Sequence, residues 1–325
     1  MIRIFANANY DFIGMRRKAV IATGVLLALG LVALLGRRIN YSIEFTGGTM
    51  VEAKIASAAP WDIETVRSEL ATAGLGNVEI TPFGDGHEIA IRAQDVVAGG
   101  DVNDTQATAN AVGAVLDQIA GTGQWTRMSA EAVSPKVGGD LRSQAFLAIF
   151  FSFFAVLAYL AWRFEWRFGL ASVVATAHDI ILTICFIAVM KIEVGLVVVA
   201  AVLSMVGYSL NDTIIIFDRV RENMHRDRNR DWIPVLNRSI NETLPRSVLT
   251  HTTTLAALTA LILFGGDVIQ PFALVMAFGV FTGTFSSIFI AAPVLLMIEQ
   301  KWPGMGGHGV KVAKATPRRS ASQSV

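Results

Sequence analysis

The sequence has few of the side chains that build metal centres and covalent active sites. Cys185 is the single cysteine and lies in an apolar run, so an intrachain disulfide and a cysteine metal site are both excluded. The one long polar segment has no clustered His or Cys, no paired acids at ligand spacing and no nucleophile motif. We therefore expect a binding or mechanical protein with no metal and no organic cofactor, and not an enzyme.

Charged residues are also scarce. They make up 16% of the 325 residues, against 53% apolar residues and a mean hydropathy of +0.51, which excludes an ordinary soluble domain. The net charge of +1 gives no indication of acidic partners. The sequence predicts a polytopic α-helical membrane protein, because six apolar runs approach or exceed the roughly 20 residues that cross a bilayer. These runs are Ala19–Gly36, Gln144–Trp162, Leu170–Met190, Leu196–Phe217, Ser247–Gly266 and Phe272–Ile298.

The basic residues near the span ends predict the orientation. The first run follows Arg16, Arg17 and Lys18, but its length and the lack of a cleavage site after Gly36 favour a retained anchor over a signal peptide. With the N-terminus inside, 18 of the 27 Lys and Arg residues are cytosolic, and most of the others lie in the long polar segment. Both termini are therefore predicted to be cytosolic, which makes the polar segment periplasmic.

The chain divides into five parts. We predict a cytosolic N-terminus (1–18) at the membrane surface, a first transmembrane helix (19–36), a periplasmic domain (37–143), helices two to six with a cytosolic loop at 218–246 (144–298), and a disordered cytosolic tail (299–325). The periplasmic segment reads as strand, helix, strand, strand, helix, strand, the order of a ferredoxin-like α+β domain. In it, Gly47 and Gly48 are interpreted as a turn or bulge; an anion cradle would need a following helix and lysine.

The loop between the fourth and fifth spans is rich in arginine. Seven arginines there alternate with five acids, which favours a loop that fixes topology over a nucleic-acid site, and we expect no nucleic-acid partner. Ile233, Leu236, Ile240 and Leu244 recur at helical spacing behind Pro234. This pattern predicts a short amphipathic helix in contact with lipid.

The candidate functional residues are polar groups inside the apolar runs. A lone acid such as Asp212 is costly in a membrane helix and marks function by default. Arg246 begins the next helix at the same end, so we predict an Asp212–Arg246 pair that responds to protons. The alternatives are a static ion pair for Asp212 and an interface anchor for Arg246. The supporting residues on the two helices are Ser204, Tyr208, Asn211 and Thr250.

A second acid lies deeper in the third span. Asp179 is either a further station for the proton or a structural acceptor for hydroxyl groups. His178 beside it is a candidate relay member, although packing is the simpler role for His178 and for His251. Gly279 and Gly283 form a GxxxG motif that predicts close helix packing.

These observations suggest a mechanism. Protonation of Asp212 from outside would break its pair, and release of the proton inward would restore it. One charge moved through 100 mV supplies about 2.3 kcal/mol, which shifts a two-state equilibrium by roughly 50-fold.

The segment GYSLNDTIIIFDRVREN (207–223) closely resembles the signature of the SecF family of the bacterial Sec export machinery. EFTGGT (44–49), VSPKVGGDL (133–141), AHD (177–179), TLPRSVLTHTTTL (243–255) and LFGG (263–266) resemble other motifs of that family, in the same order. Glu44 stands where the family usually has Asp, which keeps the charge.

The resemblance implies a subunit in the bacterial inner membrane, similar in fold to half of a resistance-nodulation-division transporter. It implies SecD, the SecY-E-G channel, YajC and the exported unfolded polypeptide as partners, with protons as the coupling ion. Asp212 and Arg246 match the residues of the family's proton pathway. Two other functions remain open: a proton-coupled small-molecule exporter, and a scaffold whose buried charges are purely structural.

Overall fold

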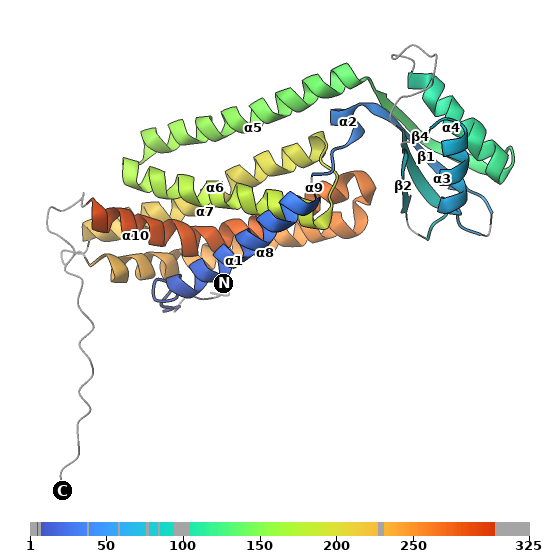
Figure 1. Ribbon diagram of the computed structural model, residues 1–325. Coiled ribbons are helices and arrows are strands. Elements are labelled where there is room, and N and C mark those ends of the chain that lie inside the picture. Colours follow the sequence, from blue (N-terminus) through green and yellow to red (C-terminus); the bar gives the residue numbers. More distant parts are fainter. Residues whose placement is uncertain are drawn as a thin grey trace, which may run out of the picture.

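The protein is a bundle of long helices with a smaller α/β domain at one end (Figure 1). The computed structural model describes residues 5, 8–37, 39–57, 59–75, 78–83, 85–93, 105–226 and 231–302. The bundle consists of α1 (Arg16–Arg37), α5 (Pro135–Arg163), α6 (Trp166–Met190), α7 (Leu196–Arg226), α8 (Trp232–Phe264), α9 (Gly266–Ser286), η1 (Ser287–Ala291) and α10 (Ala292–Lys301).

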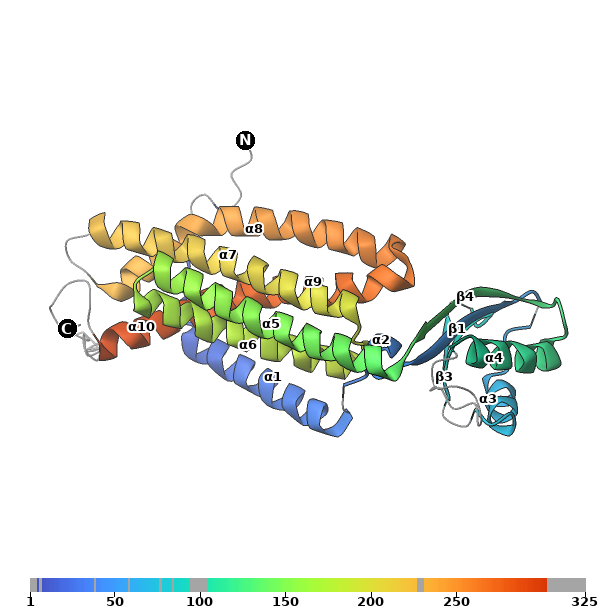
Figure 2. The same ribbon diagram turned by 90° about the horizontal axis from the view of Figure 1, so that it is seen from above.

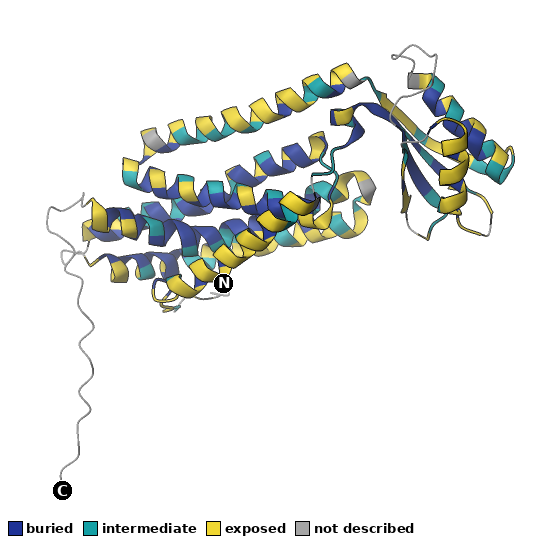
Figure 3. Cartoon of the chain, in the orientation of Figure 1, coloured by how far each residue is buried: buried dark blue, intermediate teal, exposed yellow. Residues whose placement is uncertain are grey.

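Six helical segments of the described chain are long and apolar enough to cross a membrane, so the prediction of a multi-pass membrane protein is confirmed. The sixth segment is built from α9, η1 and α10 in succession. More than half of the most apolar stretch of α7 is buried, whereas α1 and α5 expose most of their residues, as the colours in Figure 3 show. The centre of the bundle is therefore α7 together with α6 and the α9–η1–α10 segment, and α8 packs on its outside.

The predicted loop at 218–246 is wrong, because most of it is helical. Helix α7 continues to Arg226 and α8 begins at Trp232, with Pro245 inside it. The predicted interfacial helix is thus the first part of α8, where Ile233 is exposed and Leu236 and Ile240 are buried in the bundle core.

The charges of that region join the two helices. Glu242 on α8 accepts hydrogen bonds from Arg219 on α7 at 2.6 Å and from Arg238 at 2.9 Å. The opposite charges that alternate along the sequence therefore pair across a helix–helix contact. Alternation alone does not distinguish this arrangement from a solvated loop.

The described part of the N-terminal head packs on the same half of α8. The side-chain oxygen of Asn241 accepts a hydrogen bond from the Tyr10 amide, and its side-chain nitrogen donates one to the Tyr10 carbonyl, both at 2.9 Å. The side-chain oxygen of Asn237 accepts a hydrogen bond from the Ile13 amide at 2.9 Å. Ile13 is fully buried in the bundle core. The head therefore has a docking site of its own. The predicted disordered tail (299–325) begins too early, because α10 continues to Lys301; the rest of it, from 303 onward, lies outside the described residues.

The α/β domain follows the predicted order of strands and helices. Its elements are β1 (Gly48–Ile55), α3 (Ile63–Thr72), β2 (Val78–Phe83), β3 (Glu88–Ala93), α4 (Thr105–Ala120) and β4 (Trp125–Val133). The sheet is antiparallel with the strand order β2-β3-β1-β4. Figures 1 and 2 show both helices on one face of it. Val51, Leu70 and Leu116 are fully buried in the core of this domain.

A short helix, α2 (Ile43–Thr46), connects the bundle to β1 and was not predicted. It ends at Gly47, whose φ is 75°, and Gly48 follows with a φ of 129°. Side chains are strained at such angles, so glycine is required at both positions. The interpretation of Gly47 and Gly48 as a turn is confirmed. Gly138 at the start of α5 packs against this turn, since a Cβ there would lie 2.8 Å from the Gly47 nitrogen.

Candidate functional site

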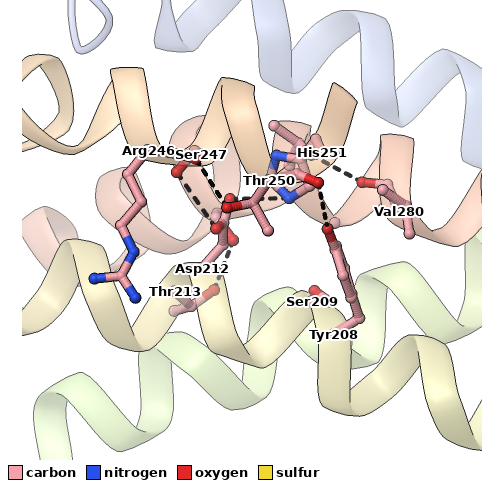
Figure 4. A network of polar contacts seen from close by, with 12 residues as sticks. Tyr208, Ser209, Asp212, Thr213, Arg246, Ser247, Thr250, His251 and Val280 are labelled. Carbon is pink, nitrogen blue, oxygen red and sulfur yellow. Dashed lines mark hydrogen bonds and ion pairs between the residues drawn. The ribbon is translucent and has the colours of Figure 1, made fainter. Parts of the chain in front are cut away.

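The carboxylate of Asp212 is buried between α7 and α8 (Figure 4). Its Oδ1 accepts a hydrogen bond from the Ser247 hydroxyl at 3.3 Å, and its Oδ2 lies 3.3 Å from Nε2 of His251. Ser247 and His251 are four residues apart on α8, so they share the face that packs on α7. A buried acid is thus held beside an imidazole, a side chain that can accept or donate a proton.

The predicted Asp212–Arg246 pair is not formed in this arrangement. Figure 4 shows the Arg246 side chain directed away from Asp212, and Arg246 is exposed. The reason is geometric: Arg246 precedes Ser247 by one residue, which rotates it about 100° around the helix axis. The turn of α8 expected from the sequence does lie beside Asp212, but the side chains that contact the carboxylate are those of Ser247 and His251. The spacing of Ser247 and His251 was the available signal.

Tyr208 and Thr250 complete the wall around His251. The Tyr208 hydroxyl contacts Oγ1 of Thr254 at 2.9 Å and the backbone carbonyl of Thr250 at 3.3 Å. The Tyr208 ring lies 5.5 Å from the imidazole of His251, centroid to centroid. Both predicted supporting residues therefore lie near Asp212, but Thr250 contributes its carbonyl and bonds its hydroxyl to the Arg246 carbonyl.

Ser204 and Asn211 do not join the site. Both are exposed on α7, as is Gly207 between them. Their spacing of three, four and seven residues places these three on one stripe, and Asp212 lies about 100° further round the helix. In the described chain, Ser204 and Asn211 make no contact with the buried carboxylate whose supporting residues they were expected to be. The stripe is a polar surface on an otherwise apolar helix.

Asp179 forms a second buried centre, which contacts α7 about one turn from Asp212. Its side chain is fully buried, and Nδ1 of His178 lies 3.0 Å from its Oδ1. Ser209 of α7 and Ser286 of α9 both donate to its Oδ2 at 2.6 Å. Nε2 of His178 is 3.3 Å from the hydroxyl of Thr23 on α1. The predicted neighbours His178 and Asp179 are therefore in direct contact, and four helices meet at this centre.

The wide turn η1 gives two consecutive serines different partners. Ser286 bonds Asp179, while Ser287 lies 2.7 Å from the hydroxyl of Thr213 on α7. Pro293 has no amide hydrogen to donate to the preceding turn, which accounts for the break in the regular helix. Such π-helical turns recur at functional sites.

The two centres are separate and share one helix. Asp212 and Ser209 are three residues apart on α7 and belong to different centres. No hydrogen bond between the two carboxylate centres is found among the described residues, so passage between them needs a rearrangement or water. Nor does the described chain bring together three His, Cys, Asp or Glu side chains that could hold a metal ion.

Comparison with known proteins is consistent along nearly the whole chain. The family described as "Protein export membrane protein SecD/SecF, C-terminal" matches residues 113–301, and the "SecD/SecF GG Motif" matches residues 32–59. The protein translocase subunit SecF of Gemmatimonas aurantiaca is 48% identical over 93% of this chain and 91% of its own length. SecF of Magnetococcus marinus is 40% identical over 92% and 95%.

Solved structures agree with the arrangement of the helices. The crystal structure of SecDF from Thermus thermophilus, a translocon-associated membrane protein, has a TM-score of 0.79 and 31% identity. It covers 92% of this chain, and this chain covers 40% of it. A structure of SecDF in a super-membrane-facing form has a TM-score of 0.65 over 90% of this chain. The chain spans well under half of the SecDF polypeptides it resembles.

Proposed function

The chain belongs to the SecD/SecF family and is a SecF-type accessory subunit of Sec protein translocation, and we propose that it uses the proton-motive force to promote that transport. The relatives are translocase subunits, which argues against the small-molecule exporter considered from the sequence. The coupling ion in this proposal is the proton, and no other cofactor takes part.

The observation that carries the proposal is the contact of Asp212 with His251 inside a membrane-spanning bundle. A purely structural polar pair could be replaced by packed apolar side chains at little or no cost in stability. Asp212 and His251 are buried, lie 3.3 Å apart and can each gain or lose a proton. Such a pair serves a purpose if its charges change during transport. Proton uptake at Asp212 weakens its attraction to a charged His251 and frees α8 to shift against α7.

The energy available fits a conformational step. One charge crossing 100 mV supplies about 2.3 kcal/mol, enough to shift a two-state population by roughly 50-fold. Two solved forms of SecDF fit this chain with different TM-scores, 0.79 and 0.65, at nearly equal coverage. This supports a protein with more than one arrangement of its parts. The proposed moving part is the α/β domain.

We place this domain in the periplasm and both termini in the cytosol of a bacterial inner-membrane protein. The support is the distribution of basic residues, 18 of 27 on the cytosolic side. Its antiparallel order β2-β3-β1-β4, with two helices on one face, supports a ferredoxin-like fold.

SecD is the proposed membrane partner. The chain covers 40% of the SecDF polypeptide, which leaves room for a second half of similar size. The exposed stripe of Ser204, Gly207 and Asn211 supports a helix partner, because small and polar residues in a span favour close helix contacts. The SecY-E-G channel, YajC, the exported unfolded polypeptide and surrounding lipid are proposed from family membership.

The test is potential-driven completion of precursor transport in vesicles containing the reconstituted translocase. Asp212→Asn is expected to abolish the stimulation by a proton gradient and to leave transport measured without a gradient unchanged. The double variant Asn211→Asp/Asp212→Asn has a carboxylate in the same turn but on the exposed face of α7. It is expected not to restore the stimulation by the proton gradient. Full stimulation by the Asp212→Asn protein would overturn the proposal.

A further inference from the structure

The link between α6 and α7, residues 191–195, is bonded to the chain segment that leads into the α/β domain. The amide of Ser42 donates to the Val194 carbonyl at 3.0 Å, and the amide of Val194 donates to the Asn40 carbonyl at 2.8 Å. Tyr41 and Val194 form a parallel bridge. Two segments about 150 positions apart in the sequence thus behave as one unit at the end of the bundle.

The side chain of Glu44 extends this contact to the first turn of α7. Its Oε2 accepts a hydrogen bond from the backbone amide of Leu196, the first residue of α7, at 2.6 Å. Gly195 precedes the helix and has no side chain with which to cap it. A carboxylate at this position satisfies a free amide and interacts favourably with the helix dipole. Helix α7 is therefore capped by a residue 152 positions earlier.

A side chain at position 195 would displace the Glu44 carboxylate from the first turn of α7. A Cβ at this position would lie 2.5 Å from Oε2 of Glu44 and 2.9 Å from the Ser42 hydroxyl. The close approach of the carboxylate to the helix thus depends on glycine. The φ of Gly195 is not in the left-handed region, so the requirement is for space.

The sheet itself contacts the same link. Arg92 on β3 forms an ion pair with Glu193, and it also pairs with Glu79 of β2 at 3.1 Å. The Arg92 side chain is largely buried. The link therefore has two attachments to the α/β domain, one through α2 and one through β3. A change in the position of the domain must pull on the link or break these contacts.

Helix α7 connects this attachment with the buried carboxylates. Asp212 follows Leu196 by 16 residues, about 24 Å along an uninterrupted helix. Ser209, which donates to Asp179, lies on the same helix. A rigid helix transmits an axial or rotational displacement at one end to side chains at the other.

We propose that Glu44 is a positioning residue that couples the α/β domain to Asp212 by fixing the first turn of α7. The inference rests on the proposed proton-driven function and adds to it the path between the domain and the proton site. Gly195 is the matching requirement on the helix side. By contrast, if Glu44 only stabilised α7, the titration of Asp212 would not depend on the position of the α/β domain.

The experiment measures that dependence in the full chain assembled with its translocase partners. In a Cys185→Ala background, Arg92→Cys and Glu193→Cys are joined by a short bis-maleimide, which fixes the domain to the link. The titration of Asp212 is followed by its carboxyl infrared band, assigned by difference from Asp212→Asn. With Glu44 present, cross-linking is expected to move the midpoint by about one pH unit, a tenfold coupling.

Glu44→Ala and Gly195→Ala are each expected to remove this dependence and to lower proton-driven transport about fivefold or more. Glu131→Gln, which alters an exposed carboxylate on β4, is the control. It is expected to change neither the cross-linking shift nor the rate of proton-driven transport. A cross-linking shift that persists unchanged in both variants, or transport at the wild-type rate in both, would overturn the coupling. Failure of the proton-driven function is recognised separately, by full stimulation in Asp212→Asn.

Discussion

Nε2 of His251 lies 3.3 Å from Oδ2 of Asp212, whereas Arg246, five residues earlier on the same helix, is directed elsewhere. The immediate partner of the buried acid is thus an imidazole, which can exist with or without a charge. This differs from a permanently charged guanidinium, since the charge state of either partner can now depend on the other.

The first prediction follows from this contact. We expect His251→Asn to move the titration midpoint of Asp212 by about one pH unit, because a charge interaction within about 4 Å in a buried site is removed. Arg246→Gln, whose side chain does not contact Asp212 here, is expected to move it by less. Infrared titration of both proteins in lipid provides the comparison. A larger effect of Arg246→Gln would show that the two side chains exchange places.

A second prediction concerns the serines around Asp179. Ser209→Ala removes one of two donors to Oδ2 and leaves a buried carboxylate oxygen with fewer partners, at a cost of about 1–3 kcal/mol in stability. Ser204→Ala on the same helix is the matched control, because Ser204 is exposed. Thermal unfolding in detergent should separate the two variants. Equal midpoints would mean that Asp179 does not depend on the Ser209 hydroxyl.

The close contact of α7 with α9 gives a third prediction. A Cβ on Gly279 would lie 1.9 Å from Cγ of Met205, and one on Gly283 would lie 2.8 Å from Cβ of Ser209. We expect Gly279→Val to destabilise the bundle by about 1–3 kcal/mol through overpacking. Gly24→Val on α1, where nothing lies within 4 Å, serves as the control. Similar stability of the two variants would argue against the α7–α9 packing seen here.

The docked N-terminal segment provides a prediction about pH. Hydrogen bonds from the Gly14 amide and then from the Asn237 side chain hold the pKa of Asp11 below its ordinary value of 3.8. A folded-state pKa below the unfolded value means that the stabilisation is complete above the unfolded value and is lost as pH falls through the folded one. We therefore expect docking to weaken only below about pH 4.

Hydrogen exchange of the amides of residues 10–14, corrected for intrinsic rates, would measure this loss. Asp11→Ala is expected to reduce protection already at pH 6 and to flatten its dependence on pH. Asp140→Ala, at an exposed position on α5, should behave as the wild type. Protection that is independent of pH in the wild type would contradict the role given to Asp11.

Sequence patterns were sufficient to predict the helices and strands, but insufficient to predict which side chains contact one another. The six spans and the order of strands and helices in the α/β domain follow from hydrophobic periodicity, which depends only on local sequence. The choice between Arg246 and Ser247 as a partner of Asp212 depends on how α8 is rotated about its axis. That rotation is set by packing on α7, for which charge spacing is no guide.

Two other features were not predicted from the sequence. The wide turn η1, which separates the partners of Ser286 and Ser287, arises from Pro293 acting on the turn before it. The role of Glu44 depends on a helix that begins 152 positions later. Its charge was noted from the motif EFTGGT, but its partner is a backbone amide, which every sequence contains.

The docking of the N-terminal segment bears on how the protein should be expressed and tagged. Deleting the first fifteen residues would expose the amides of Asn237 and Asn241 and empty the site that Ile13 fills. Asn237 and Asn241 lie ten residues or more before His251 on the same continuous helix, α8. An affinity tag therefore belongs after Trp302, and a truncation that looks harmless in the sequence would give a protein with a perturbed proton site.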